Sequence, residues 1–503
     1  MEYPHDQEEY VEAVEDVVKR VRGEPSLLFW CGGNELFAEP PLHSPSQYIQ
    51  AGMRAAVASL DPTRFLIMSS MDGGLDGLDM LQHDEANALA VKDGPYGFLY
   101  PVQYYAELNP GMVNGSDVQV AFQPEVGGAS MPRMSGVSKM LGQDPNSTDV
   151  PSEMGVYVPP LWDLHKYEGY GINNTVDAVY MYGVPANTAD YVAAANIACL
   201  QQYQVSVRRR MRRPARLQSY CERSGKGCCS PLCSRPPPPC SRMWQALFEG
   251  FTRKMFKPGN EGGKTAIILW KSQSPWPAMR GFLYDWWLET VGTFEGVRKG
   301  TGGGNVVHAQ LDLAGRTVEI VNRGVAGIEK SDVVVDFFDL RGRSVMRTQT
   351  ITVGEVARMS VATSGERVAF PTTSDAVFFA RLALNGEETW YWMNTDPATG
   401  EYSYDYSSLG EWRRAGPVGS VKGKLEDGAL KIKVTGDAVV FAAYIQVFAA
   451  DGTQILPVIA SVPTVIMNDG EEVAIHVEVL DEDAVPERLV IKQWAGEDVV
   501  VMF

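Results

Sequence analysis

Cysteine is scarce in this 503-residue chain outside one segment. Five of the seven cysteines lie between Cys221 and Cys240, and the rest of the chain holds only Cys31 and Cys199. This distribution excludes a disulfide framework for the body of the protein. The clustered cysteines contain no C-x-x-C pair, which argues against a zinc site in that segment.

Long apolar runs and an excess of positive charge are also missing. No apolar run approaches the ~18 residues that a membrane-spanning helix needs, so we expect no membrane partner. The net charge of -18 disfavours a nucleic-acid partner. There is no P-loop, no dinucleotide fingerprint and no metal-spaced cluster among the six histidines. We therefore expect neither a cofactor nor a metal.

Two stretches of the chain share one pattern: a short apolar segment that ends at a glutamate and a glycine pair. The first spans residues 25–35 and ends Cys-Gly-Gly-Asn-Glu, and the second spans residues 118–128 and ends Pro-Glu-Val-Gly-Gly. Each predicts a buried parallel strand whose carboxyl end delivers a carboxylate, Glu35 or Glu125, into a cleft. We interpret Gly32 and Gly33, which precede Glu35, as positions where a bulky ligand approaches the backbone closely.

Glycoside hydrolysis needs two carboxyl groups, and two glutamates at strand ends could supply them. A retaining glycosidase holds two carboxyl groups ~5–5.5 Å apart, and the one that keeps its proton acts as the acid. The alternative for Glu35 alone is a solvated loop residue, and the alternative for Glu125 alone is a turn marked by Pro124. Asn34, which directly precedes Glu35, could hydrogen-bond a sugar hydroxyl.

Several aromatic residues are candidates for contact with a sugar. Trp270 ends the predicted strand 265–270, much as the two glutamates end theirs, and Trp276 follows shortly after. Trp162 and His165 lie in a proline-rich stretch, residues 136–173, that we expect to be irregular. Tryptophans are more often core residues than ligand platforms, but this mixture of polar and aromatic residues suits a sugar cleft.

The first 300 residues alternate between helical and strand patterns. We expect helices at 10–22, 46–60, 190–204 and 245–255, and strands at 26–31, 64–70, 118–126 and 265–270. Such alternation favours a parallel α/β sheet or barrel. Residues 205–242 break the pattern with nine arginines and a four-proline run, which predicts a disordered insertion.

After residue 303 the apolar period changes to two. Alternating segments are expected to be strands at 308–322, 333–340, 345–353, 376–384, 389–393, 430–434, 439–447, 473–479 and 489–493. Short strands of this kind, separated by turn residues, are typical of β-sandwiches. The span suits two sandwiches of roughly 100 residues each.

Residues 25–35 resemble the acid/base strand of glycoside hydrolase family 2, and residues 122–127 together with Met131-Pro132 resemble its nucleophile segment. Within the family, the resemblance is to enzymes that cleave β-mannosidic bonds. Further stretches match in the same order and extend the resemblance over roughly residues 5–415: 93–96, 162–167, 181–183, 246–250 and 270–280.

The resemblance implies a fold. Residues 1–302 would be the C-terminal part of a (β/α)₈ TIM barrel, beginning at the helix before the fourth strand, with the insertion at 205–242 foreign to the family. Two immunoglobulin-like β-sandwich domains would follow, at 303–415 and 416–503.

The resemblance also implies roles. Glu35 would be the acid/base and Glu125 the nucleophile, while Asn34 would bind the sugar 2-hydroxyl and Trp270 would line the sugar site. The substrate would be an oligosaccharide, the Manβ1-4GlcNAc linkage of N-glycan cores, cleaved in a vacuolar, lysosomal or secreted setting without a metal. The alternatives are an exo-acting β-mannosidase or β-glucosaminidase, or a non-catalytic carbohydrate-binding fragment.

Overall fold

The computed structural model describes most of the chain. Glu35 and the segment 205–242 lie outside the described residues, so the predictions made for them stay predictions. The described ranges are 4–34, 46–70, 122–127, 130–165, 175–204, 247–257, 266–279, 283–372, 377–396, 400, 402–403, 405–416, 420–436, 439–462 and 465–503.

The chain divides into two compact units. The first comprises Met1–Tyr96, Leu108–Gly127 and Gly259–Trp270. The second comprises Gly97–Glu107, Gly128–Pro258 and Lys271–Phe503. The border between the units falls inside the region expected to form a barrel. Barrel closure and the domain limits near 303 and 416 stay predictions.

The first unit combines two helices with two pairs of parallel strands. The strands at 30–31 and 66–67 are shorter than the predicted 26–31 and 64–70, but the parallel pairing agrees with the expected α/β pattern. The elements are α1 (Gln7–Val21), α2 (Gln47–Leu60), β1 (Trp30–Cys31) paired with β2 (Leu66–Ile67), and β3 (Phe122–Val126) paired with β4 (Ala266–Leu269).

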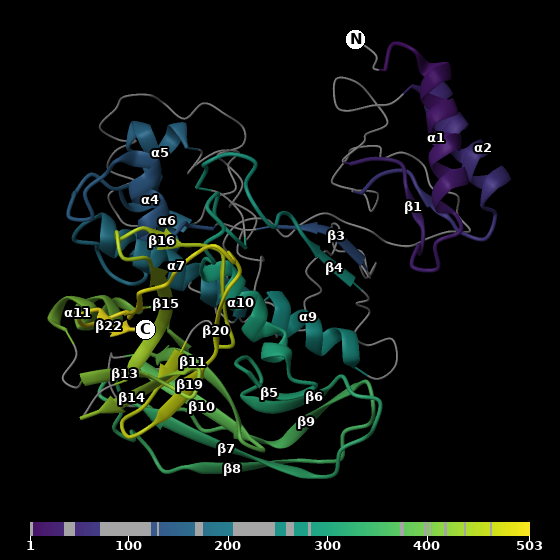
Figure 1. The fold of residues 1–503 in the computed structure, drawn as a ribbon. Coiled ribbons are helices and arrows are strands. Elements are labelled where there is room, and N and C mark those ends of the chain that lie inside the picture. Colours follow the sequence, from purple (N-terminus) through teal and green to yellow (C-terminus); the bar gives the residue numbers. More distant parts are fainter. Residues whose placement is uncertain are drawn as a thin grey trace, which may run out of the picture. The chain divides into compact units, whose positions relative to one another are not determined.

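Helices α1 and α2 lie side by side and cover the first strand pair (Figure 1). Ile49 and Met53 on the inner face of α2 pack against Met68, which follows β2. Ile67 of β2 packs against Ala266 of β4. The two strand pairs therefore share apolar contacts, as expected of neighbouring strands that are buried by helices.

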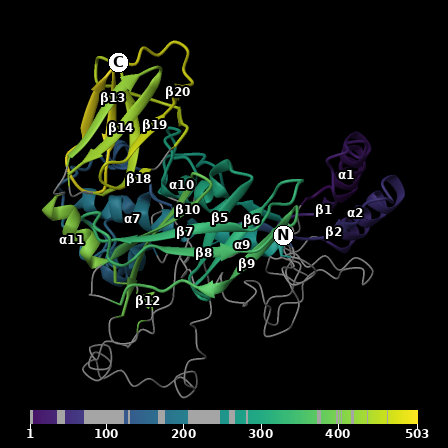
Figure 2. The same cartoon turned by 90° about the horizontal axis from the view of Figure 1, so that it is seen from below.

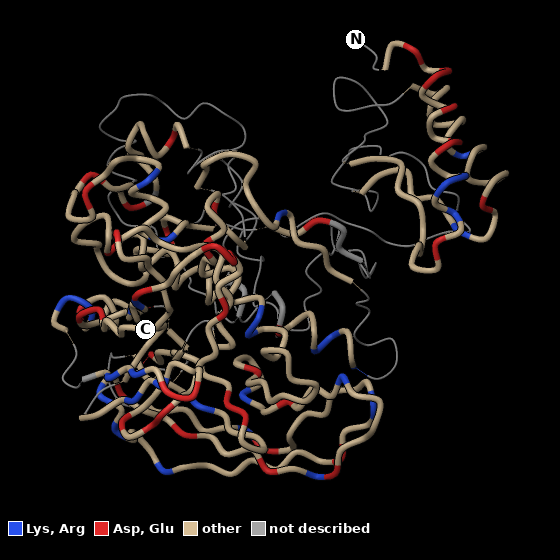
Figure 3. The backbone as a smooth tube through the Cα atoms, in the orientation of Figure 1, with Lys and Arg blue, Asp and Glu red and all other residues tan. Residues whose placement is uncertain are grey.

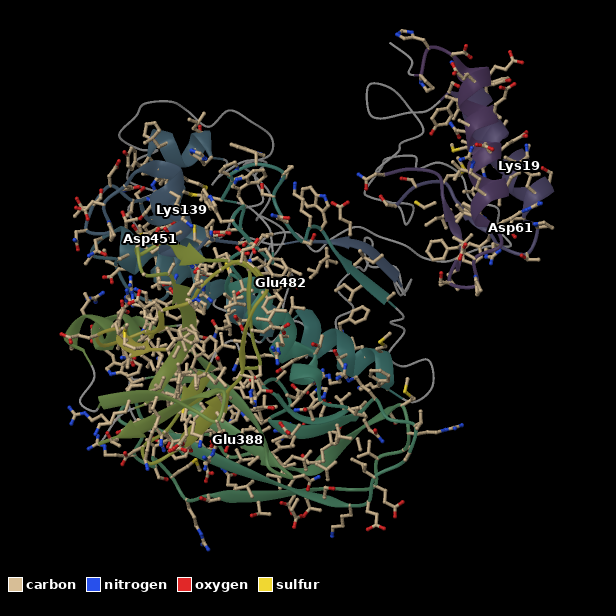
Figure 4. All side chains as sticks on the ribbon, viewed as in Figure 1. Lys19, Asp61, Lys139, Glu388, Asp451 and Glu482 are labelled. Carbon is tan, nitrogen blue, oxygen red and sulfur yellow. The ribbon has the colours of Figure 1, made fainter. Side chains whose placement is uncertain are left out.

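Asp61 ties together the starts of β1 and β2 (Figure 4). Its carboxylate accepts hydrogen bonds from Trp30 Nε1 at 3.0 Å and Arg64 Nη1 at 2.9 Å, while Arg64 Nε donates to the Leu27 carbonyl at 2.7 Å. Burial alone would raise the pKa of Asp61, but hydrogen bonds from Thr63, Trp30 and Arg64 outweigh it and lower the pKa. The carboxylate therefore stays ionised and holds both strands.

The second unit opens with a set of helices. Its early elements include α4 and α5, so the prediction that residues 136–173 are wholly irregular is wrong. Apolar residues at helical spacing form α4, and Gly142, with φ 59°, ends it. The elements are α4 (Met134–Leu141), η2 (Glu153–Gly155), α5 (Pro160–Leu164), α6 (Thr175–Tyr180), α7 (Thr188–Gln204), α9 (Leu247–Phe256), α10 (Gly292–Gly300) and η5 (Gly302–Gly304).

Two antiparallel sheets follow as a first sandwich. Leu311 N donates to the Tyr391 hydroxyl at 3.0 Å, and Thr389 Oγ1 donates to the Ala309 carbonyl at 3.0 Å, so the sheets meet at β5 and β11. One sheet has the order β5 (Val307–Asp312), β6 (Thr317–Asn322), β9 (Ser360–Arg367); the other has the order β12 (Tyr402–Ser403), β11 (Glu387–Thr395), β10 (Phe378–Leu384), β7 (Ser331–Phe338), β8 (Gln349–Val353).

Helix α11 (Ser407–Ala415) leads to a second group of antiparallel strands. Figure 2 shows β13, β14 and β19 side by side. Their apolar residues form a core with those of β15 and β21. The strands are β13 (Ser420–Glu426), β14 (Ala429–Thr435), β15 (Val440–Phe448), β16 (Gln454–Ile455), β17 (Val458–Ala460), β18 (Val465–Met467), β19 (Glu472–Ile475), β20 (Val477–Val479), β21 (Arg488–Lys492) and β22 (Val499–Met502).

One apolar core joins the helices of the second unit to both groups of strands. It holds Tyr191 of α7, Trp392 of β11 and Phe441 of β15, all nearly inaccessible to solvent. The Trp392 indole N–H donates to the Tyr182 hydroxyl at 3.1 Å, so the aromatic residues also satisfy their polar atoms. Among the described residues, no helix has the length and apolar character of a membrane span.

A buried ion network fastens α9 to the first sandwich, whose strands carry interspersed acidic and basic residues (Figure 3). Arg253 Nη1 lies 2.8 Å from Asp312 Oδ2 and 3.1 Å from Glu319 Oε2. Both Arg253 and Glu319 are less than 5% exposed in their side chains, at 4% and 3%. One turn earlier on α9, Glu249 accepts a hydrogen bond from the Tyr391 hydroxyl at 3.2 Å. The charges are desolvated but paired, which makes the network intolerant of losing one partner.

A second buried network links the segment after β4 to α4 and to the second group of strands. Glu289 accepts hydrogen bonds from the Ser135 hydroxyl, from Gln446 Nε2 at 2.6 Å and from Gln454 Nε2 at 2.9 Å. Nearby, one oxygen of Asp285 accepts two backbone N–H groups, and the other is buried without a hydrogen-bond partner among the described residues. Burial raises the pKa of Asp285 to about 6.

We predict that Arg253→Met lowers the free energy of unfolding by about 3–5 kcal/mol, because Glu319 and Asp312 keep their buried charges without a cation. Arg343→Met is the matched control, since its pair with Asp339 is exposed on the arginine side and should contribute less than about 1 kcal/mol. Urea denaturation of both variants measures the difference. A neutral effect of Arg253→Met would show that α9 does not depend on this network.

The raised pKa of Asp285 predicts that the free energy of unfolding falls as the pH rises. Its pKa in the folded chain lies above the unfolded value, so its stabilisation is complete below pH ~4 and is lost as the pH rises through about 6. Asp285→Asn should remove about 1–3 kcal/mol of the fall in unfolding free energy between pH 4 and 7, as followed by urea denaturation at several pH values. Asp483→Asn, at an exposed position, should leave the profile unchanged. Identical profiles for Asp285→Asn and the unaltered chain would contradict the assignment.

Candidate functional site

Glu125 lies on β3 at a β-bulge. Gln123 pairs with Ile267 and Val126 pairs with Leu269, so Pro124 and Glu125 together stand opposite one residue of β4. Bulges occur next to active sites, where the extra residue redirects a side chain, and they tolerate proline because the local ladder is already interrupted. The half-buried Glu125 carboxylate is therefore held by strand pairing at both sides.

Trp270 meets the same strand end from β4. Its backbone N–H donates to the Val126 carbonyl at 2.7 Å, and its side chain is 37% exposed. A Cβ at Gly127 would lie 2.5 Å from the Trp270 carbonyl oxygen and 3.5 Å from the indole Cε3. The structure thus brings Glu125 and Trp270 to one pair of strand ends, as the sequence predicts for residues that follow parallel strands.

Gly32 has the same role at the end of β1. Its N–H donates to the Ile67 carbonyl at 2.8 Å, and a Cβ there would lie 2.9 Å from the Met68 carbonyl oxygen. Gly32 and Gly127 therefore allow close approach of the neighbouring strand's backbone. For Gly32, this corrects our interpretation that the glycine makes room for a ligand.

Asn34 follows β1 and is exposed. Its Oδ1 accepts a hydrogen bond from Ser70 Oγ at 3.2 Å, and the Ser70 N–H donates to the Gly33 carbonyl at 3.1 Å. The Asn34 amide is thus oriented at the strand end, where a sugar hydroxyl could reach its nitrogen. Glu35 comes next but lies outside the described residues, so the separation of the two carboxyl groups stays a prediction.

His165 and Trp276 form a pair in the second unit. Their rings stack with centroids 5.9 Å apart and planes inclined by 21°. His165 Nδ1 lies 2.7 Å from the Pro277 carbonyl, which can only accept, so Nδ1 is the donor of this hydrogen bond. Trp276 is 39% exposed and offers a ring face to solvent.

Trp162 was expected to contact substrate, but the structure places it in the hydrophobic core. It is 0% exposed, it meets Tyr191 edge-on at 5.3 Å, and its only N–H donates to Gln143 Oε1 at 2.8 Å. A side chain with no exposed surface and no spare donor cannot hold a sugar. We therefore assign Trp162 to packing beneath the His165 segment.

The sequence analysis overlooked the bulge at Pro124 and Glu125. A proline inside an otherwise apolar strand was an available signal, because proline is confined to strand edges, first residues and bulges. Within the described ranges, no group of three or more His, Cys, Asp or Glu side chains is arranged to hold a metal ion.

Comparison with known proteins gives one related sequence and several related structures. No family model matches the chain. A mannosylglycoprotein endo-beta-mannosidase of Lilium longiflorum is 24% identical over 378 residues, which cover 67% of this chain and 31% of the relative.

Two solved structures illustrate the likeness of fold. The exo-chitosanase CsxA of Amycolatopsis orientalis is 17% identical with a TM-score of 0.69 over 99% of this chain and 54% of that one. A beta-D-mannosidase from Dictyoglomus thermophilum is 14% identical with a TM-score of 0.58 over 100% of this chain and 52% of that one. The chain thus spans about half the length of these structures and about a third of the lily protein. Together these relatives confirm the resemblance to glycoside hydrolase family 2.

We predict that Gly127→Ala disrupts the β3–β4 strand ends, because its Cβ would press on the Trp270 carbonyl. Overpacking of this kind costs about 1–3 kcal/mol. Hydrogen exchange of the Trp270 amide, which donates to Val126, should become faster. The control is Gly354→Ala, where a Cβ meets no atom within 4 Å and exchange should not change. Equal exchange in both variants would show that the close approach is not needed.

Proposed function

We propose that this chain, a relative of glycoside hydrolase family 2, carries the catalytic glutamates of a retaining glycosidase that cleaves β-mannosidic bonds. The observation that supports this most is the half-buried Glu125 on a bulge at the carboxyl end of β3, beside the exposed ring of Trp270. A nucleophilic carboxylate needs a fixed direction of attack and partial desolvation, and a bulged strand end beside an aromatic ring provides both.

In the proposed mechanism, Glu125 attacks the anomeric carbon and forms a covalent glycosyl-enzyme. Glu35, in its protonated form, gives its proton to the departing glycosidic oxygen. Water then attacks the anomeric carbon while Glu35 takes the proton back, so the configuration is retained. Asn34 would hydrogen-bond the 2-hydroxyl, and Trp270 would lie against the apolar face of the ring.

The substrate proposed is the Manβ1-4GlcNAc linkage of an N-glycan core. The name of the lily relative supports a mannosylglycoprotein substrate. The alternatives, an exo-acting β-mannosidase or β-glucosaminidase, would release different sugars from those that the proposed enzyme releases.

We predict that Glu125→Gln lowers hydrolysis of an aryl β-mannoside by about 10³-fold or more, because the nucleophile is lost. The experiment uses the full-length gene product. A 2-deoxy-2-fluoromannosyl reagent with a good leaving group should trap the intermediate, and mass spectrometry should find the label on the peptide that contains Glu125. Glu329→Gln, at an exposed position of the first sandwich, is the control and should keep full activity.

Other outcomes would contradict the proposal or favour one of the alternatives. Label on another carboxylate, or full activity of Glu125→Gln, would reject Glu125 as the nucleophile. Hydrolysis of an aryl β-glucosaminide in preference to the mannoside would favour the exo-glucosaminidase alternative. Binding of sugars with no hydrolysis by the full-length product would favour a non-catalytic carbohydrate-binding role.

A further inference from the structure

Two cavities in the second unit share Tyr444. The first, about 480 Å³, lies between helices α4 and α7 and strands β15 and β21. The second, about 380 Å³, lies between the 272–294 segment and strand β17. We name them together the junction groove, whose defining residues are Arg133, Val192, Tyr284, Phe294, Tyr444 and Trp494.

Arg133 and Tyr444 bring uncommitted hydrogen-bonding groups into this groove. Arg133 is 6% exposed, and its guanidinium carbon lies 3.8 Å from the centre of the Tyr444 ring. Its Nε donates to the Thr290 carbonyl at 3.1 Å, which fixes the side chain. Neither its terminal nitrogens nor the Tyr444 hydroxyl makes a hydrogen bond within the part of the chain that the structure describes. These atoms keep contact with solvent in the groove, so they are available to hydrogen-bond a polar occupant.

Two of the cations that line the groove are paired with carboxylates. Arg413 Nε pairs with Asp190 Oδ1 at 2.9 Å, and Lys492 pairs with Asp498. Two others donate to backbone carbonyls, Arg298 to Ala460 and Ser461 and Arg133 to Thr290. Burial raises the pKa of Tyr444 to about 12, and the charges of Arg133 and Glu289 act on it in opposite directions.

The backbone beside Tyr444 is strained. The pairing of β15 with β18 shifts register between Val440 and Ala443, and Ala442 between them has φ 52°, a left-handed conformation unusual for alanine. Ala442 lines the first cavity. Bulges and left-handed non-glycine residues persist where surrounding contacts hold them, often at ligand sites.

We propose that the junction groove binds a neutral saccharide. Its apolar walls, Val192 and Trp494 among them, suit the C–H faces of sugar rings, while Arg133 and Tyr444 would hydrogen-bond hydroxyl groups. A wholly apolar ligand would leave the Arg133 donors unpaired. The choice of sugar rests on the proposed function, from which we infer an N-acetylglucosamine-containing oligosaccharide.

The test is titration of N,N′-diacetylchitobiose into the full chain, followed by calorimetry. Tyr444→Phe removes only a hydroxyl that has no protein partner, so it should weaken binding about tenfold without unfolding the chain. Arg133→Met should weaken binding about tenfold or more. Tyr48→Phe, at a tyrosine 54% exposed on α2, is the matched control and should bind as the unaltered chain does.

Three results would overturn the proposal: no binding up to about 10 mM, unchanged affinity in Tyr444→Phe, or tighter binding of galacturonate than of the neutral disaccharide. Binding is measured without turnover, so it is independent of the catalytic proposal. Loss of chitobiose binding in Tyr444→Phe would support the groove even if Glu125→Gln were fully active.

Discussion

The candidate site depends on one close backbone contact, that between Gly127 and Trp270. The Trp270 N–H reaches the Val126 carbonyl at 2.7 Å, and its own carbonyl occupies the space where any larger residue at 127 would place its Cβ. This contact continues the hydrogen-bond ladder between β3 and β4 beyond the bulge. The bulge that contains Glu125 is therefore held between two paired residues, Gln123 and Val126. Rigid backbone on both sides would suit the proposed role of Glu125 as a nucleophile, because small displacements of a reacting group are costly in rate.

The second unit is held by a different kind of interaction. Its helices and both groups of strands share one apolar core, but the buried charges specify how the elements meet. Arg253 forms ion pairs with carboxylates on β5 and β6, and Glu289 accepts hydrogen bonds from side chains on α4, β15 and β16. Apolar packing alone tolerates sliding of one element on another, whereas a desolvated carboxylate is satisfied in only one arrangement. The junction groove lies beside the second of these networks.

Much of the fold follows from local patterns in the sequence. The 3.6-residue period places α1, α2 and α7, and the two-residue period places most strands after residue 303. Strand β9 could not be predicted from its own sequence, because Ser360–Arg367 is mostly polar. It forms a strand because it pairs with β6. The pair Glu125 and Trp270 could be foreseen because parallel strands end at one edge, but the burial of Trp162 could not. Its position depends on Gln143 and Tyr191, which are distant in sequence.

The positions that break local rules are the most informative for function. Pro124 stands inside a strand, and Ala442 adopts a left-handed conformation in β15. Each irregularity interrupts a ladder that the surrounding sequence would otherwise continue, so each must be offset by tertiary contacts. At Pro124 those contacts are the Val126 and Trp270 pairing, and the outcome is a redirected Glu125. At Ala442 they are the shared aromatic core, and Ala442 and Tyr444 line the same cavity. The proposed site and the proposed groove thus each lie beside a strand irregularity, where tertiary contacts and not the local ladder decide how the side chains are directed.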